Sequence, residues 1–438
     1  MTQITDTPAR EPALSVDLAI VGAGPVGLAL AGWLAQRSST RALTVALIDT
    51  RDAAASLAAG SQADPRAIAV SQGSRMLLEP LAWPVEATTE RGNSSGINSS
   101  GINSVGVIKQ IHISQQGHFG RALIDHREHG LPALGYVVRY SRLVEQLAQA
   151  VKASPVRWLT HTTAQAPLQD AAGVTLPLSS SDASGPADLR ASLVIHAEGG
   201  LYQPPHAGAA PDRAPRPTDS PQVRPMQTRD YQQTAIVGTV RVASPRPAVA
   251  WERFTPEGPL ALLPLGGTQQ EWALVWCGRP AASQARMAMS EPDFLAALQS
   301  AFGTRMGRFT HIDARAVFPL GLNALQQLVD GRTAAIGNAA QTLHPVAGQG
   351  LNLGLRDAYA LVDALAQHGA NPEALRDFAA RRAGDRRLTI AATDTLARAF
   401  TADFAPLGAL RGLALSALDF MPPAKTWLAR QMMFGQRR

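Results

Sequence analysis

Two closely spaced glycines, Gly348 and Gly350, separate an apolar stretch that ends near residue 336 from an Ala/Leu-rich segment at about 351–365. Glycine lets the backbone approach a flat or phosphorylated ligand, because it has no Cβ. The free N–H groups at the start of the following helix carry about half a positive charge and favour an anion or an electron-rich ring edge. Gly and Pro are also common in ordinary connecting loops, so this segment alone does not establish a ligand site.

The same segment contains the candidate catalytic residues, His344 and Pro345. Imidazole titrates near neutral pH and could serve as a general base. Pro345 restrains His344 to extended backbone geometry, however, and we favour a role for His344 in shaping the loop. The spacing of the other His, Asp and Glu residues indicates no further catalytic pair, and no metal-ligand cluster is evident in the sequence.

A βαβ pattern near the N-terminus predicts a dinucleotide site. It comprises an apolar strand at 16–21, the glycines Gly22, Gly24 and Gly27, a helix at 26–36, a second strand at 43–48 and Asp49. In such a unit the glycines allow a tight turn, close approach to a pyrophosphate and close helix–strand packing, while the acid binds a ribose. The strands and the acid stand in the places that such a unit requires.

The composition is that of a globular enzyme with two or three domains. The chain has 438 residues, of which 45% are hydrophobic and 17% charged, and its formal net charge is +6. Lys and Arg are scattered rather than grouped with aromatic residues, which disfavours nucleic acid as a partner. The single cysteine, Cys277, excludes an internal disulfide and fits a reducing cytoplasm. The polar first 15 residues do not have the pattern of a signal peptide.

The remaining pattern predicts a β-rich unit inserted into the nucleotide-binding unit. Short stretches typical of antiparallel strands lie at 107–114, 135–139, 232–242, 249–255, 260–265 and 272–276. Because the two glycine-rich segments lie near opposite ends of the chain, the nucleotide-binding domain must be discontinuous. We place that domain at 15–90, 134–200 and 315–400, the β-sheet domain at 105–133 and 228–314, a Pro-rich linker at 201–227, C-terminal helices at 401–438, and the Asn-Ser-Ser-Gly-Ile repeat at 93–103 in a surface loop.

Several motifs together resemble those of a known family. They are Gly22-Ala23-Gly24-Pro25-Val26-Gly27, Asp64-Pro65-Arg66-Ala67-Ile68-Ala69, Leu134-Gly135-Tyr136-Val137-Val138, Glu252-Arg253-Phe254-Thr255 with Gly258-Pro259-Leu260-Ala261-Leu262-Leu263-Pro264, and the segment that contains Gly348. The chain resembles the flavin-dependent aromatic hydroxylases of ubiquinone biosynthesis, which are related to para-hydroxybenzoate hydroxylase. It is most similar to the 2-octaprenyl-6-methoxyphenol hydroxylase (UbiH) type, because Gly337-Asn338-Ala339-Ala340 stands where sister enzymes have Gly-Asp. It departs from the family's Ala-Asp-Gly motif at Ala197-Glu198-Gly199.

The resemblance implies an α/β fold: a Rossmann-like FAD-binding domain of the para-hydroxybenzoate hydroxylase type, an inserted antiparallel β-sheet substrate domain and a C-terminal helical tail. It implies FAD as cofactor, NAD(P)H as co-substrate and O₂ as oxidant. The reduced flavin would capture O₂ as a C4a-hydroperoxide and hydroxylate a polyprenylated phenol similar to 2-polyprenyl-6-methoxyphenol. A flavoprotein reductase and a non-catalytic flavoprotein subunit of a quinone-biosynthesis assembly are the alternatives.

The resemblance also implies roles for individual residues. The N-terminal glycines would approach the FAD pyrophosphate, and Asp49 would bind the adenosine ribose. Arg66 and Arg142 are candidate FAD contacts, and a solvated surface arginine is the alternative for each. Pro345 would close one side of the active pocket. The remaining cofactor-binding candidates are Gly337 and Asn338, the latter toward the ribityl or phosphate oxygens, and Gly348, Gln349, Gly350, Leu351 and Asn352, which would lie along the flavin ring.

The C-terminal segment 405–438 combines apolar residues at helical spacing with interspersed Lys and Arg. A helix packed on the core and a helix in contact with a membrane surface or a partner protein are equally compatible with this pattern. We therefore expect a cytoplasmic protein that could lie at the periphery of the inner membrane, in contact with a ubiquinone-biosynthesis complex.

Overall fold

The computed structural model describes most of the chain, and the structural statements below concern that part. The described residues are 14–51, 64–81, 83, 105–117, 121–181, 186–199, 226–266, 270–399, 426, 429–431 and 433–435. The repeat at 93–103, nearly all of the predicted linker at 201–227 and most of the predicted helical tail at 401–438 lie outside the described residues.

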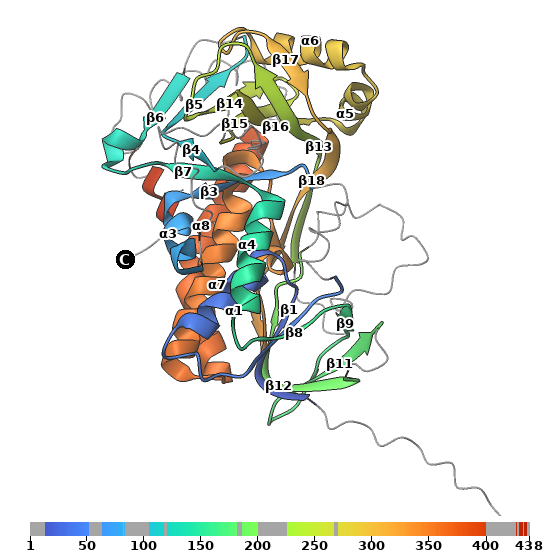
Figure 1. Ribbon diagram of the computed structural model, residues 1–438, viewed down its shortest axis with the longest axis vertical. Helices are drawn as coiled ribbons and strands as arrows, with labels where there is room; N and C mark the ends of the chain where they lie inside the picture. The colour runs from blue at the N-terminus through green and yellow to red at the C-terminus, as the bar shows by residue number, and fades with distance from the viewer. Residues whose placement is uncertain are drawn as a thin grey trace, which may run out of the picture.

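The first sheet is built around a row of parallel strands at the lower end of Figure 1. In spatial order these are β20 (Thr333–Ala335), β12 (Asp188–His196), β1 (Leu14–Val21), β2 (Val45–Ile48) and β8 (Arg157–Leu159). Leu18 and Ile20 of β1 pack in the cluster that includes α1, whereas Val16 and Ala19 pack on the opposite face. A parallel strand covered on both faces needs such a continuous apolar run. The antiparallel additions are β9 (Thr162–Ala164), β10 (Leu168–Gln169), β11 (Val174–Ser180) and β19 (Val329–Asp330).

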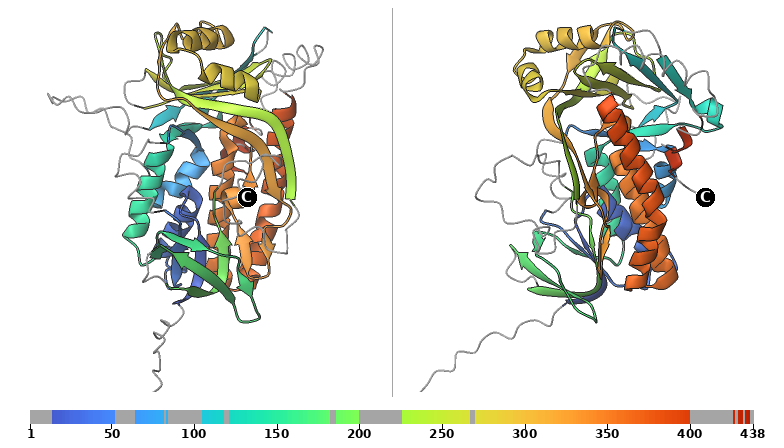
Figure 2. Two further views of the ribbon diagram at one scale, coloured as in Figure 1. Left: turned by 90° about the vertical axis from the view of Figure 1, so that its right-hand side faces the viewer. Right: turned by 180° about the vertical axis from the view of Figure 1, so that it is seen from behind.

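Four helices form the layer beside this sheet, as Figures 1 and 2 show. They are α1 (Pro25–Gln36), α4 (Tyr140–Lys152), α7 (Gln349–His368) and α8 (Pro372–Ala399). Helix α1 contacts both α4 and α7, and α7 contacts α8. The first ten residues of α1 are all buried, as expected for a helix that is apolar on every side.

The second sheet lies at the upper end of Figure 1. Its order is β21 (Gln341–Thr342), β18 (Ala316–Leu325), β13 (Met226–Val242), β16 (Glu271–Gly278), β15 (Gly258–Pro264), β14 (Val249–Thr255), β5 (Gln110–Gln115) and β6 (Arg121–Asp125), with β17 (Phe309–Ile312) paired to β13. All pairs are antiparallel except β14 with β5. One face packs on α6 (Glu291–Phe302), with α5 (Pro280–Met287) beside it.

Two strands connect the two ends of the molecule. In Figure 2, β13 and β18 run from the second sheet toward the first. They pair along most of their length, with a register shift between Asp230 and Gln233 and a positive φ of 52° at Gln232. The predicted boundary at residue 315 therefore differs from the structure, because β18 belongs to the second sheet rather than to the cofactor domain.

A small third sheet corrects another expectation. It contains β3 (Ala67–Ser71), β7 (Gly135–Arg139) and β4 (Gly106–Ile108). Helix α3 (Gln72–Leu78) follows β3 directly in the chain. The single strand expected at 107–114 is two strands: β4 pairs with β7, whereas β5 pairs with β14. The chain changes sheets at Lys109, whose N–H donates to the carbonyl of Ala248 at 2.8 Å.

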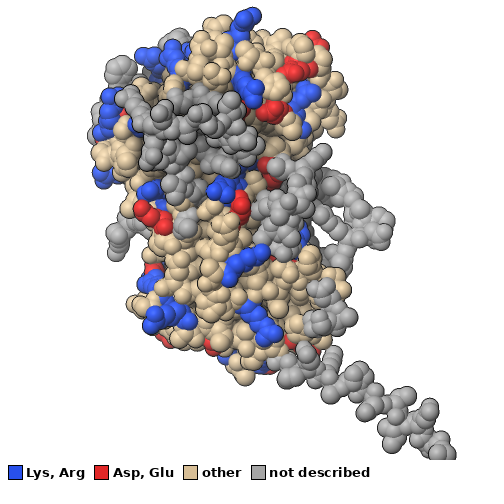
Figure 3. Space-filling view, viewed as in Figure 1, with Lys and Arg blue, Asp and Glu red and all other residues tan. Residues whose placement is uncertain are grey.

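No helix among the described residues is long and apolar enough to cross a membrane. On the face shown in Figure 3, Lys and Arg side chains are dispersed among uncharged residues.

Candidate flavin and substrate site

All three sheets contribute to one large cavity of about 1910 Å³. This volume exceeds the roughly 300–1,000 Å³ of a pocket for one drug-sized ligand. The lining comes from the first sheet and its glycine loop (21, 22, 24–26, 48–51, 197–199), from β3 and the residues before it (64–71), from the second sheet (111, 113, 235, 237, 238, 250–252, 254, 259, 261, 263, 273–275, 277, 318–321) and from the segment that leads into α7 (342, 343, 345, 346, 348–352). The cavity can therefore hold an extended cofactor together with a second ligand.

The N-terminal glycines have three different structural roles. Gly22 has φ +107°, and a Cβ there would lie 2.7 Å from the backbone N of Glu198. A Cβ on Gly27 would lie 2.0 Å from the carbonyl oxygen of Gly22, so Gly27 permits α1 to pack on the loop. A Cβ on Gly24 would meet nothing within 4 Å, and Gly24 lines the cavity. This is the distribution of roles that the Gly-x-Gly-x-x-Gly spacing predicts.

Asp49 lies at the end of β2 beside this loop. Its Oδ2 accepts a hydrogen bond from the N–H of Ala23 at 2.7 Å, and its Oδ1 accepts one from the N–H of Arg51 at 2.8 Å. The side chain lines the cavity and is 9% exposed. An ionised carboxylate has about four acceptor positions, so Asp49 can hold the loop and still accept hydrogen bonds from a ribose.

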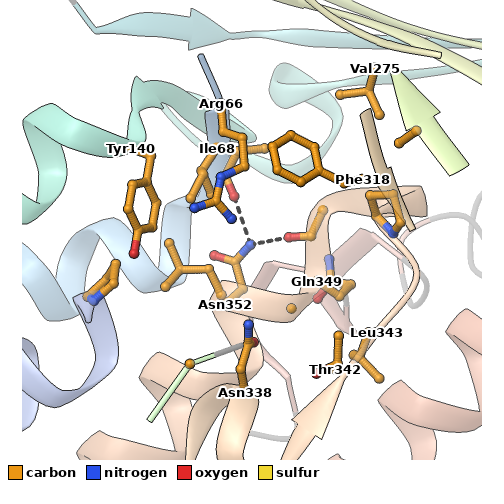
Figure 4. A pocket seen from close by; sticks show the side chains of 18 of the residues that line it. Arg66, Ile68, Tyr140, Val275, Phe318, Asn338, Thr342, Leu343, Gln349 and Asn352 are labelled. Atoms are coloured by element: carbon orange, nitrogen blue, oxygen red, sulfur yellow. Dashed lines mark hydrogen bonds between the residues drawn. The ribbon is translucent and has the colours of Figure 1, made fainter. Parts of the chain in front are cut away.

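The second glycine-rich segment faces the same cavity. Gly337, with φ +60°, begins the short helix η5 (Gly337–Ala339) and packs against the side chain of Val26 on α1. The next residue, Asn338, is exposed and lines the cavity. Helix α7 begins after Gly348, which has φ +60° and lies at the end of η6 (Val346–Gly348). Pro345, Gly348, Gln349, Gly350 and Leu351 also line the cavity. Figure 4 labels Gln349 together with Asn338.

The helix starts at this cavity are suited to an anionic group. No side chain caps the N-terminus of α1, whose N-cap is Gly24, or that of α7, whose N-cap is Gly348. Neither helix has an acidic residue in its first turn. The dipoles and first-turn N–H groups of both helices therefore favour a ligand that carries negative charge.

Asn352 has a structural function that the sequence analysis did not assign. Its Oδ1 accepts a hydrogen bond from the N–H of Ser71 at 2.9 Å. Its Nδ2 donates to the carbonyl of Ala69 at 3.0 Å and to that of Gly348 at 2.7 Å, as the dashed lines in Figure 4 show. These bonds use the amide to join β3 to the start of α7, so its contribution to a cofactor site is to position the backbone.

The two candidate arginines occupy different places. Arg66 lines the cavity, forms an ion pair with Asp64 and lies 4.4 Å from the ring centroid of Tyr140. Arg142 is not among the described residues that line the cavity; it lies in the first turn of α4 and donates to Glu145 at 2.8 Å. The geometry thus supports Arg66 as a cofactor contact and gives Arg142 the alternative role of a surface ion pair.

His344 is buried beneath the cavity rather than on its lining. Its side chain accepts a hydrogen bond at Nδ1 from the N–H of Val346 at 3.2 Å, so the proton lies on Nε2, which donates to Oε1 of Gln233 at 3.1 Å. Burial lowers the pKa of His344 to about 4. A neutral, fully bonded imidazole of this kind holds the loop in place, and this geometry favours the structural role over that of a base.

The sequence analysis quoted Glu252 within a motif but assigned it no role. The structure places it on the wall that the second sheet contributes to the cavity. Burial in apolar surroundings raises the pKa of its carboxyl to about 7. The alternation of Ala250, Glu252 and Phe254 along one strand face was the available signal, but the sequence did not reveal which face borders a ligand.

The described residues fit a flavin dinucleotide. They provide an open glycine at a helix start, a carboxylate at the end of the second strand, a second uncapped helix start, and an apolar wall on the far side. No group of three or more His, Cys, Asp or Glu side chains among the described residues could hold a metal ion. The altered motif residue Glu198 also lines the cavity, and its Oε2 lies 3.1 Å from Nδ1 of His196.

Comparisons with known proteins agree with this geometry. A family described as FAD binding domain matches residues 15–385. Ubiquinone hydroxylase UbiL of Rhodospirillum rubrum is 32% identical over 425 residues, which cover 95% of this chain and 89% of that protein. The 3-demethoxyubiquinol 3-hydroxylase of Escherichia coli is 30% identical over 92% of this chain and 94% of that enzyme.

Solved structures show the same fold. The structure of p-nitrophenol 4-monooxygenase PnpA from Pseudomonas putida aligns with a TM-score of 0.70 and 15% sequence identity, and the alignment covers 97% of this chain and 100% of PnpA. The FAD-binding fold of the para-hydroxybenzoate hydroxylase type is thereby confirmed, whereas the branch within the family stays a prediction. This chain is an FAD-dependent monooxygenase and belongs to the family of flavin-dependent aromatic hydroxylases of ubiquinone biosynthesis.

Proposed function

We propose that this protein hydroxylates the aromatic ring of a polyprenylated phenol, similar to 2-polyprenyl-6-methoxyphenol, in ubiquinone biosynthesis. NAD(P)H serves as the reductant and O₂ as the oxidant. The names of the relatives support the pathway, since two of them are hydroxylases of ubiquinone or its precursors. The UbiH-like sequence at Asn338 supports the substrate class.

One observation carries this proposal: the glycine loop and the apolar face of the second sheet border the same cavity. Gly24 and Asp49 line one part, and Ile113, Ala261 and Val275 line another. A dinucleotide bound at the glycine loop would therefore share its cavity with an apolar ligand. Such a wall suits a prenylated ring better than a highly polar substrate, because burial of apolar area stabilises the complex by about 25 cal/mol per Å².

The residues of this chain bind and orient the reacting groups. Asp49 and the backbone at Gly24 bind the nucleotide part, and the start of α7 supplies N–H groups for the negative charge of a reduced flavin. Pro345 and Leu351 exclude water from one side. The bound flavin would supply the activation of O₂ and the transfer of oxygen to an electron-rich ring.

The route of a lipophilic substrate forms part of the proposal. The cavity lining extends to Leu388, Ala392 and Leu396 of α8 and to Met433 near the C-terminus. These apolar residues support a prenyl chain that lies beside α8. Contact of the C-terminal segment with a membrane surface or a biosynthetic complex would place the substrate near this side.

The test begins with the visible spectrum of the purified protein, reconstituted with FAD if needed. NADH and NADPH are then added without O₂, with and without a short-chain 2-prenyl-6-methoxyphenol, and turnover is followed under ¹⁸O₂. We expect reduction of the flavin and one labelled oxygen atom in the ring product. Failure to bind FAD contradicts the proposal. Flavin that neither nicotinamide reduces supports a non-catalytic subunit, and reduction without labelled product supports a reductase.

A further inference from the structure

The second sheet presents one carboxylate to the cavity within an apolar row. Glu252 of β14 lies opposite Ile113 of β5 on one side and Ala261 of β15 on the other. The row continues through Val275 to Val237. All five residues line the cavity. Glu252 is thus the one ionisable side chain in this row, and the other four side chains are aliphatic.

The other face of β14 is occupied by the protein core. Trp251 packs with Phe302 of α6 in a T-shaped arrangement, with ring centroids 5.8 Å apart. Along the same strand, Ala250 and Phe254 line the cavity together with Glu252, and the largely buried Trp251 also reaches the lining. Because successive side chains of a strand point to opposite faces, Glu252 points away from the core and into the space that would hold the substrate.

The carboxylate of Glu252 has no hydrogen-bond or ion-pair partner among the residues that the structure describes. An isolated buried charge is costly, and buried charges in proteins are normally paired. The protein thus retains, in an apolar wall, a group that lowers stability when ionised. Such a group is a candidate for ligand recognition.

The neighbouring titratable groups do not explain Glu252 as a structural ion pair. On β5, His112 stacks on Trp251, with ring centroids 4.5 Å apart, on the core face of the sheet. Strand β15 contains no titratable side chain. On β16, Glu271 is bonded to Arg241, and burial, followed by the charge of Glu252, raises the pKa of the Cys277 thiol. No cation from these strands therefore compensates Glu252.

We propose that Glu252 recognises the phenolic hydroxyl of the substrate, by accepting its O–H in a hydrogen bond that orients the ring in the cavity. This inference rests on the proposed function. The hydrogen bond is charge-assisted and therefore strong. It also increases the electron density of the ring, which favours the addition of an electrophilic oxygen atom. A ring whose hydroxyl is methylated would leave the carboxylate unpaired, so Glu252 selects free phenols.

The experiment compares a short-chain 2-prenyl-6-methoxyphenol with its O-methyl ether. Binding to the FAD-loaded enzyme is measured from the flavin absorbance change for the wild type, Glu252→Gln, Glu252→Leu and the control Glu257→Gln. Glu257 lies in the turn between β14 and β15, where it pairs with Arg286 outside the cavity. The flavin spectrum and the affinity for FAD verify that each variant is folded.

We expect the wild type and Glu257→Gln to prefer the phenol by about 10- to 100-fold, the range of a hydrogen bond to a charged group. Glu252→Leu should lose this preference because it binds the phenol more weakly, with little change for the ether. The wild-type kcat/KM should rise with pH toward about 7, as the carboxyl ionises, and this limb should be absent in Glu252→Gln.

Two outcomes would overturn different parts of this account. If the wild type binds the phenol and hydroxylates it, but both Glu252 variants keep the preference and the pH profile, the inference about Glu252 is wrong and the proposed function stands. If the wild type binds neither compound and forms no hydroxylated product, the proposed function fails and the inference fails with it.

Discussion

Oδ1 of Asn352 accepts a hydrogen bond from the backbone N–H of Ser71 at 2.9 Å, which joins two segments that are 281 residues apart in the sequence. Asn352 also donates to Ala69 and Gly348, so one buried amide fixes the start of α7 against β3. The start of α7 is therefore positioned by β3, a strand that belongs to neither glycine-rich segment.

Replacement of Asn352 by Ala should lower the free energy of unfolding by about 2–3 kcal/mol, because it leaves buried backbone groups without partners. FAD affinity should fall as well, since the start of α7 loses its attachment. Urea unfolding and FAD fluorescence titration measure the two effects. Asn371→Ala is the control: it removes a cap of α8, should cost about 1 kcal/mol and should leave FAD affinity unchanged. Equal FAD affinity in both variants would contradict the positioning role of Asn352.

Gly24→Ala and Gly27→Ala should fail in different ways, although both change the same motif. A Cβ on Gly24 meets no protein atom within 4 Å, so that variant should fold with near wild-type stability but bind FAD at least about 10-fold more weakly. A Cβ on Gly27 would lie 2.0 Å from a backbone oxygen, so that variant should lose stability even without FAD. Thermal unfolding of the apoproteins and their FAD content distinguish the two. A strongly destabilised Gly24→Ala apoprotein would argue against an open cofactor approach at that residue.

Asp49→Asn should weaken FAD binding by about 10-fold or more. The amide oxygen can still accept a hydrogen bond from Ala23, but the neutral side chain offers fewer acceptor positions and no charge to ribose hydroxyls. Equilibrium dialysis of FAD provides the measurement. Asp17→Asn serves as the control, because Asp17 is bonded to Thr44 outside the cavity lining. Equal losses in both variants would indicate a general effect on the first sheet.

His344 should make the protein less stable in acid. Burial lowers its pKa from 6.5 to about 4, so below pH 6.5 the unfolded chain gains a proton that the folded chain does not. Stability should therefore fall by about 3 kcal/mol between pH 6.5 and 4 on this account. His344→Asn retains an acceptor for the N–H of Val346 and should flatten this part of the profile, as measured by urea unfolding at several pH values.

The same variant tests whether His344 acts as a base. The FAD-loaded His344→Asn enzyme should keep the pH dependence of kcat, because the imidazole does not line the cavity. A new pH dependence, with full FAD occupancy and intact fold, would restore His344 as a catalytic residue.

The sequence predicted those features that depend on local spacing. The turn after the first strand, the end of the second strand before Asp49 and the helix near Gly350 were predicted within a few residues, because tight turns and helix starts require particular residue types. The separation of β4 from β5 at Lys109 was missed, since both strands have the same alternating pattern and only their tertiary partners differ. Glu252 was missed because the sequence does not reveal which face of its strand borders the cavity. Arg142 was proposed from its place at a helix start, but its side chain pairs with Glu145.

The connections between the sheets limit how ligands reach the cavity. Lys109 alone separates β4 from β5, although these strands belong to different sheets, and β13 extends over 17 residues between the two ends of the molecule, with one register shift between Asp230 and Gln233. A hinge that separated the sheets would have to bend the paired strands β13 and β18 and to move the single-residue connection at Lys109. The architecture therefore favours entry of ligands into the cavity through local rearrangement of side chains and short loops, while the first and second sheets keep their relative positions.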